Sequence, residues 1–241
     1  MNLGVNVDHV ATLRNARGTT YPEPVIAALC AEYAGCSSIV VHVREDHRHI
    51  KERDACLIKQ AIKIPLNLEM SVNKTIVSFA LALKPKQATL VPERRQELTT
   101  EGGLDLIKNG LKIEKVSRQL KTAGIAVSLF VDPVKNQIKL ARSMGVSLIE
   151  INTGKYSESK NSSGFKRQLS KIKEAVNFAK SQGFSVACGH GLDYENIKPI
   201  VKIKGITEFN IGHSIVCRSV FVGFPLAVEE MLGLIEKVSR Q

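Results

Sequence analysis

The chain has 241 residues, of which 44% are hydrophobic and 24% charged. These values are typical of a soluble globular protein that is long enough to form a core without disulfide bonds. The formal net charge of +11 favours anionic partners such as phosphorylated metabolites, nucleic acid or acidic membranes, but an aromatic content of 5% and the absence of tryptophan argue against nucleic acid.

Short apolar runs rich in β-branched residues alternate eight times with longer amphipathic stretches. The predicted strands, in chain order, are residues 3–8, 38–43, 65–69, 88–91, 125–130, 147–151, 184–188 and 207–211. The predicted helices between and after them are residues 23–34, 52–62, 74–83, 113–123, 133–144, 166–182, 194–201 and 226–238. Several of these helices end at a glycine that suits a left-handed C-cap, namely Gly35, Gly124, Gly145 and Gly183.

Eight strand–helix units in a chain of this length predict one α/β domain over residues 1–241, folded as a closed parallel (β/α)8 barrel. An open, doubly wound sheet is the alternative architecture. It is disfavoured because no GxGxxG motif follows the first predicted strand.

One connection, residues 92–110 after the fourth predicted strand, is longer than the usual loop between a strand and a helix. It contains the pair Gly102 and Gly103, which could act as a hinge. We expect a lid over the active site, with a surface insertion as the alternative.

Polar residues occupy every second position at the ends of five predicted strands: Asn6 and Asp8, His42 and Arg44, Asn67 and Glu69, Glu150 and Asn152, and Asn210 and Gly212. Side chains of a strand alternate between its two faces, so when one face packs on the helices these polar residues must point into the barrel. The six histidines, His9, His42, His47, His49, His190 and His213, all fall at the end of a strand or just after it. Active sites of such barrels gather at this end, so the pattern predicts one here.

The residue types suggest acid–base chemistry on a phosphorylated substrate. His42 and Glu69 come from neighbouring strands and could face each other across the barrel, and His190 follows the seventh strand. Arg17 and Arg44 offer forked donors for phosphate, whereas Arg14 could bind phosphate or form a salt bridge that orders a loop. The glycine-rich loops 189–191 and 212–214 predict a phosphate site, with simple tight turns as the alternative.

Other chemistries fit less well. His47 and His49, with Glu45 and Asp46, could ligate a metal, but no HExxH or zinc-type spacing is present and the segment is as easily a substrate loop. No GxSxG motif occurs, and no predicted strand carries an inward lysine for an enzyme-bound imine.

The chain also shows no sign of export or membrane insertion. Its five cysteines form no CxxC pair and are expected to be reduced thiols, namely Cys30, Cys36, Cys56, Cys188 and Cys217. No stretch approaches the roughly 20 apolar residues that a membrane span requires. We therefore expect a cytoplasmic protein without membrane or nucleic-acid partners.

Segments spread over the whole chain resemble the pyridoxine 5′-phosphate synthase family, whose members close the ring of vitamin B6. The longest is Gly4-Val-Asn-Val-Asp-His-Val-Ala-Thr-Leu-Arg-Asn-Ala-Arg-Gly18. The others are residues 41–49, 67–70, 90–94, 99–105, 189–192 and 210–213. The resemblance implies a condensation of 3-amino-2-oxopropyl phosphate with 1-deoxy-D-xylulose 5-phosphate, which yields pyridoxine 5′-phosphate, phosphate and water without a metal or organic cofactor.

The resemblance also implies roles for individual residues. His42 and Glu69 would accept protons, His190 would donate one, and Glu150 would stabilise a transition state. The aminoketone phosphate site would comprise Asn6, Arg17, Gly191, Gly212 and His213. The deoxyxylulose phosphate site would comprise Asp8, His9, Arg44, His49 and Thr99. Members of the family typically form homo-octamers in which the loop after the fourth strand closes over the barrel mouth.

The chain departs from that family at two places. Asn152 stands where relatives carry histidine, which removes a titratable group, and the helix start after the eighth strand carries Cys217 and Ser219 where smaller residues are expected. Two alternative functions remain open: another phosphate-binding barrel enzyme, such as an isomerase that uses Glu69 and a histidine, or a basic binding protein that kept the barrel and lost the chemistry.

Overall fold

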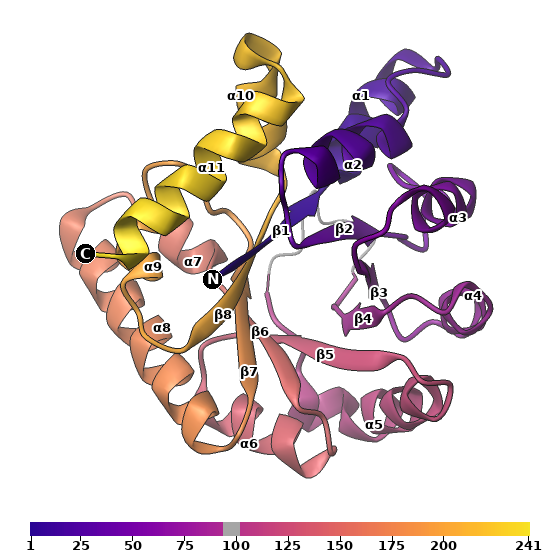
Figure 1. Ribbon diagram of the computed structural model, residues 1–241. Helices are drawn as coiled ribbons and strands as arrows, with labels where there is room; N and C mark the ends of the chain where they lie inside the picture. Colours follow the sequence, from indigo (N-terminus) through magenta and orange to yellow (C-terminus); the bar gives the residue numbers. More distant parts are fainter. Residues whose placement is uncertain (94–101) are drawn as a thin grey trace.

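The computed structural model describes residues 1–93 and 102–241. Eight parallel strands, each hydrogen-bonded to the next and the last to the first, form a closed barrel (Figure 1). They are β1 (Asn2–Asn6), β2 (Ser38–His42), β3 (Leu66–Met70), β4 (Gln87–Leu90), β5 (Ala126–Val131), β6 (Leu148–Asn152), β7 (Ser185–Gly189) and β8 (Ile206–Ile211). The predicted single (β/α)8 barrel is confirmed.

Helices surround the ring of strands on its outside (Figure 1). Seven correspond to predicted helices: α2 (Pro24–Tyr33), α3 (Glu52–Ala61), α4 (Lys74–Leu83), α5 (Leu106–Thr122), α6 (Lys135–Ser143), α8 (Ser162–Ser181) and α11 (Phe224–Ser239). The predicted helix 194–201 is represented by the shorter α9 (Ile197–Val201). Three more helices are α1 (Asp8–Arg17), α7 (Gly154–Ser157) and α10 (His213–Val222).

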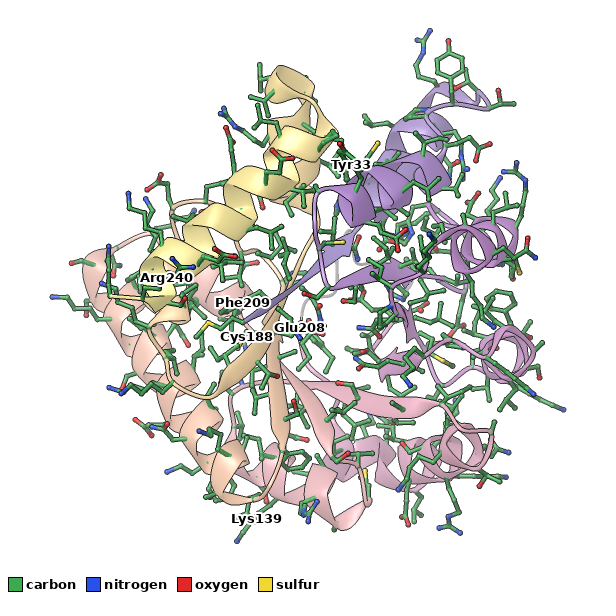
Figure 2. All side chains as sticks on the ribbon, viewed as in Figure 1. Tyr33, Lys139, Cys188, Glu208, Phe209 and Arg240 are labelled. Carbon is green, nitrogen blue, oxygen red and sulfur yellow. The ribbon has the colours of Figure 1, made fainter. Side chains whose placement is uncertain are left out.

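The strands are apolar on the face that packs against the helices. Cys188 of β7 and Phe209 of β8 are register partners, are fully buried and lie close together in the barrel wall (Figure 2). All four glycines predicted to end helices have positive φ angles, between 69° and 94°. Glycine adopts this conformation without the steric cost that a Cβ would impose, so each helix stops there and the next strand begins.

The first strand is shorter than predicted. It ends at Asn6, because the Asn6 Oδ1 accepts a hydrogen bond from the backbone N–H of Asp8 at 2.9 Å and turns the chain into α1. Asp8 and His9 therefore lie in the first turn of a helix, and the prediction that Asp8 belongs to the strand was wrong. His213 likewise begins α10. Both segments remain at the carboxyl end of the barrel.

The connection after β4 also ends earlier than predicted. The Asp105 carboxylate caps α5 by accepting the N–H groups of Ile107 and Lys108, both at 3.1 Å, so helix begins at Leu106 and not at residue 113. Gly110, the predicted end of the connection, is a helical residue. The predicted lid 92–110 thus includes five helical residues, and its part at 94–101, which contains Thr99, lies outside the described residues. In the described ranges, no helix combines the length and the apolar character that a bilayer crossing demands.

Candidate active site

The carboxyl ends of the strands surround a cavity of about 460 Å³. Most of the predicted site residues line it, from strands that are far apart in sequence. The lining residues are Asn6, His9, Glu69, Val91, Phe130, Glu150, His190, Gly191, Leu192, Asp193, Asn210, Ile211, Gly212, His213 and Ser214. The predicted inward orientation of Glu69, Glu150 and Asn210 is therefore confirmed.

His42 lies between two carboxylates, of which Glu69 lines this cavity while His42 itself does not. His42 and Glu69 are register partners on β2 and β3, and the His42 Nδ1 lies 3.9 Å from the Glu69 Oε2. They are side by side and do not face each other across the barrel. The other ring nitrogen, Nε2, lies 2.8 Å from the Glu93 Oε1. An ionised Glu93 accepts the proton of Nε2, which leaves Nδ1 of the neutral ring unprotonated on the side of Glu69.

Glu69 and Glu150 bring two carboxyl groups into the barrel interior. Burial raises the pKa of Glu69 well above its ordinary value, and the negative charges of Glu150 and Asp8 raise it further. Burial raises the pKa of Glu150 to about 7, against a hydrogen bond from the Asn210 Nδ2 at 2.6 Å that favours the charged form. Carboxyl groups that titrate near neutral pH can accept or donate protons under working conditions.

Gly189 makes room for the second of these carboxylates. It is paired with Asn152 at the end of β7, and a Cβ atom at this position would lie 2.2 Å from the Glu150 Oε1. A side chain at residue 189 would therefore displace the Glu150 carboxylate from the barrel interior.

Among the described residues, five histidines stand around the mouth of the barrel. The rings of His9 and His213 meet edge to face with centroids 4.9 Å apart, and those of His42 and His49 are 5.8 Å apart. Burial lowers the pKa of His9, His49 and His190, so these rings favour the neutral state more than a solvated imidazole does. Neutral imidazoles can both donate and accept hydrogen bonds to a polar substrate.

One end of the cavity is formed by the start of α10 and the loop after β7. Gly212 precedes α10, and a Cβ there would lie 2.8 Å from both Cβ and O of Asn6. Gly191 has a φ of 75°, and a Cβ there would lie 2.1 Å from the Ser157 Oγ. Both glycines thus permit a close approach of backbone segments, and the free N–H groups in the first turn of α10 can bind an anion such as phosphate.

The residues predicted for the deoxyxylulose phosphate site do not all line one cavity. Arg44 is buried and contributes to a neighbouring cavity of about 510 Å³, which is also lined by Glu45, Asp46, His47, Asn73, Thr75, Ile76 and Glu93. Asp8 reaches toward β2, where its Oδ1 accepts the backbone N–H of His42 at 2.9 Å. His49 lies beside His42.

Asp8, His42 and His49 are also of the types that bind metals, and their ligand atoms lie within 4.8 Å of one another. His49 is poorly prepared for this role. Its Nδ1 accepts the backbone N–H of Ile50 at 2.9 Å, so the neutral ring carries its proton on Nε2, the nitrogen that would have to face an ion. The absence of a metal in the reaction remains a prediction.

The two other arginines proposed for phosphate, Arg14 and Arg17, do not line the two cavities. The Arg14 guanidinium forms a two-pronged salt bridge with Asp54 of α3, with N–O distances of 2.8 and 2.7 Å, and both side chains are buried. Of the two alternatives, the salt bridge that orders a loop is the one observed. Arg17 is exposed in the last turn of α1 and lines neither of the two cavities.

Asn152 is engaged within the protein. Its Nδ2 donates to the Asp132 Oδ1 at 2.9 Å, its Oδ1 accepts the N–H of Gly154 at 2.8 Å, and its side chain is buried. The same Asp132 oxygen accepts the N–H of Gly103 at 3.1 Å. Residue 152 therefore links β6 to β5 and to the segment before α5, and it does not line the cavity.

Sequence reasoning assigned no role to Glu93, Asp132 or Thr153. Glu93 was visible only as a charged loop residue, and Asp132 only as a polar residue that directly follows an apolar strand. A polar residue immediately after a strand of a parallel barrel is a usable signal, because it lies at the active-site end.

Comparison with known proteins identifies the family of the chain. A family model described as "Pyridoxal phosphate biosynthesis protein PdxJ" matches residues 3–237. Pyridoxine 5′-phosphate synthase of Pelobacter propionicus is 50% identical over 234 residues, which cover 97% of this chain and 98% of the relative. The protein of that name from Blochmanniella pennsylvanica is 47% identical over 238 residues, covering 99% and 98%.

Solved structures of lower similarity share the fold alone. N-(5′-phosphoribosyl)anthranilate isomerase from Pyrococcus furiosus superposes with a TM-score of 0.66 at 12% identity, over 98% of this chain and 99% of that one. Since the family model and the relatives both span nearly the entire sequence, the chain belongs to the PdxJ family of pyridoxal phosphate biosynthesis proteins.

Proposed function

We propose that the protein is a pyridoxine 5′-phosphate synthase that condenses 3-amino-2-oxopropyl phosphate with 1-deoxy-D-xylulose 5-phosphate. The products are pyridoxine 5′-phosphate, phosphate and water. Membership of the PdxJ family and the names of the relatives support the reaction. The observation that carries the proposal is the convergence of His42, Glu69, Glu150 and His190 at one barrel mouth, beside a helix start suited to phosphate.

The reaction requires several proton transfers, and the four side chains can each take a different part in them. The amine of one substrate condenses with the ketone of the other, after which phosphate is eliminated, water adds and the ring closes. We assign proton acceptance to His42 and Glu69, proton donation to His190 and stabilisation of a transition state to Glu150. The raised pKa of Glu69 supports its role, because a carboxylate with a higher pKa is the stronger base.

We assign the phosphate of the aminoketone to the end of the cavity formed by Asn6, Gly191, Gly212 and His213. The first turn of α10 supports this placement through its backbone N–H groups. The deoxyxylulose phosphate is assigned to the side of Asp8, His9, Arg44 and His49. The formal net charge of +11 would draw both anionic substrates toward the protein. Arg17 is not retained in this assignment, since it is exposed and lines neither cavity.

The test is to mix the purified protein with both substrates and to follow pyridoxine 5′-phosphate by its absorbance between pH 6 and 9. Each substrate alone is the control. Product that forms only with both substrates supports the proposal. Folded protein that makes no product at any of these pH values contradicts it, and conversion of one substrate alone would indicate an isomerase.

We further propose that the enzyme is a cytoplasmic homo-octamer. The helices α2 and α11 pack against each other, and they carry the exposed apolar side chains Tyr33 (Figure 2), Ile26 and Leu226. Exposed apolar side chains that lie near one another support self-association. The five free cysteines are compatible with a reducing compartment. Light scattering on the purified protein should give eight times the chain mass of 26.4 kDa, and a monomeric mass would contradict the assembly.

A further inference from the structure

His190, the proposed proton donor, has an unusual backbone conformation. Its φ angle is 79°, a left-handed value that residues with a side chain rarely adopt, and Gly191 follows with a φ of 75°. Such a conformation is strained for a residue with a side chain and persists only where the surroundings enforce it. Neighbouring groups must therefore hold the loop that aims the imidazole into the cavity.

Thr153 supplies that restraint from the end of β6. Its backbone N–H donates to the carbonyl oxygen of Gly189 at 2.9 Å. Its hydroxyl Oγ1 lies 2.7 Å from the same oxygen and 2.6 Å from the carbonyl oxygen of His190, so the hydroxyl proton is shared between the two carbonyls. Thr153 is fully buried, so water cannot replace these hydrogen bonds.

The short helix α7, which follows Thr153, packs against the imidazole itself. A Cβ atom at Gly154 would lie 2.9 Å from the His190 Cδ2, so this glycine lets the helix touch the ring. The ring of Phe130 meets the imidazole edge to face, with centroids 6.3 Å apart. The backbone and the ring of His190 are thus restrained from two sides, by residues from β5 and from the turn after β6.

We propose that Thr153 is the positioning residue of His190, and that its hydroxyl holds the left-handed backbone which directs the imidazole into the cavity. The catalytic part of this inference rests on the proposed function, since His190 must be the proton donor of the synthase. The geometric part does not, because the restraint on the imidazole exists whatever reaction the site performs.

The experiment compares three variants with the unaltered protein. Thr153→Val keeps the shape of the side chain and removes the hydroxyl, whereas Thr153→Ser keeps the hydroxyl. Thr207→Val is the matched control, because the exposed Thr207 hydroxyl donates to the carbonyl oxygen of Val186 at 3.0 Å, near the start of β7, whereas His190 directly follows the end of that strand. The measured quantities are kcat, KM for each substrate, and the titration of the His190 imidazole by NMR, assigned with His190→Asn.

We expect Thr153→Val to lower kcat by about 10- to 100-fold with KM changed by less than about threefold, because a displaced acid impairs the transition state more than binding. Burial now holds the pKa of His190 below its ordinary value, while Glu158 beyond α7 opposes this shift, and His9 is another titratable group close by. A released loop admits water to the ring, so its pKa should rise. Thr153→Ser and Thr207→Val should behave like the unaltered protein.

Two results would overturn the proposal: a Thr153→Val variant with kcat within twofold and an unchanged His190 titration, or a Thr153→Ser variant as impaired as Thr153→Val. If valine prevents folding, Thr153→Ala removes the same donor with a smaller side chain. If the unaltered protein makes no pyridoxine 5′-phosphate, the proposed function fails, but the NMR titration still decides whether Thr153 positions His190.

Discussion

His42 and Glu69 are register partners on adjacent strands, and the His42 Nδ1 lies 3.9 Å from the Glu69 Oε2. This separation is too long for a hydrogen bond, so neither side chain is bound to the other and both can contact the same substrate group. Because the polar members of both strands point inward, the parallel pairing of β2 and β3 is sufficient to bring the two groups together. The relationship makes the two residues the first targets for substitution.

We expect Glu69→Gln and His42→Asn each to keep the fold and to lower kcat by about 100-fold or more, because each removes a group that can accept a proton. Initial rates with both substrates measure the loss, and circular dichroism with a thermal melt checks the fold. Near-normal rates in both variants would show that the proton-acceptor roles are assigned to the wrong residues.

Glu93→Gln should lower kcat by about tenfold or more, although Glu93 needs no contact with substrate. Burial by itself would raise the pKa of Glu93, but the hydrogen bonds from the His42 ring and the Glu45 N–H, together with the positive charge of Arg44, outweigh burial and lower this pKa, so the carboxylate stays ionised. A glutamine can offer its NH2 group to Nε2 and permit the other tautomer of His42.

The nitrogen chemical shifts of the His42 ring report its tautomer directly. Glu45→Gln is the control, since the Glu45 carboxylate accepts hydrogen bonds from the side chains of Ser71 and Asn73. If Glu93→Gln and Glu45→Gln have equal rates and the His42 shifts do not change, Glu93 does not set the tautomer.

The buried Glu150 carboxyl should make stability depend on pH. Burial raises its pKa from 4.5 to about 7, so the folded state binds the proton more tightly than the unfolded state. The stabilising contribution is complete below about pH 4.5 and is lost as the pH rises through about 7. Glu150→Gln has no carboxyl group that ionises, so it does not undergo this loss. The free energy of unfolding of Glu150→Gln minus that of the unaltered protein should therefore increase between these pH values and stay constant above them.

Urea denaturation at pH 4.5, 6, 7 and 8.5 measures this difference. Glu229→Gln is the control, because Glu229 is exposed on α11 and its substitution changes no burial of charge. A difference between Glu150→Gln and the unaltered protein that stays constant with pH would mean that Glu150 does not bind a proton more tightly in the folded state.

Asp54→Asn should destabilise the protein by about 3 kcal/mol, because it removes the carboxylate that binds the buried Arg14 guanidinium at two points and leaves only Glu23, 3.7 Å from Nη1, as a charged partner. The equivalent change in an exposed pair, Glu114→Gln opposite Arg118 on α5, should cost less than about 1 kcal/mol. The urea midpoints of the two variants, at equal slope, give the comparison. Equal losses in the two variants would mean that the Arg14–Asp54 pair contributes no more than a surface pair.

Local patterns were enough to predict much of the barrel. Hydrophobic periodicity located all eight strands to within two residues of their observed ends, and the helix 74–83 was predicted with its observed bounds. The alternation of polar and apolar residues also placed Glu69, Glu150 and Asn210 inside the barrel. These features depend on properties of neighbouring residues, namely the two-residue repeat of a strand and the glycine stop of a helix, which the sequence determines by itself.

Contacts between distant segments were decided only by the tertiary structure. Arg14 forms a salt bridge with Asp54 and does not line the cavity, Glu93 is hydrogen-bonded to His42, and Asn152 is hydrogen-bonded to Asp132. The residues of each pair are 20 or more positions apart in the sequence. The predicted strand residues after Asn6 are not in a strand either, because a hydrogen bond from the Asp8 N–H to the Asn6 side chain turns the chain into α1. In each case a polar side chain had several possible hydrogen-bond partners in the sequence. The strand register and the loop paths of the closed barrel decided which partner lies close to it. Burial then excludes the water that would otherwise form hydrogen bonds with both groups.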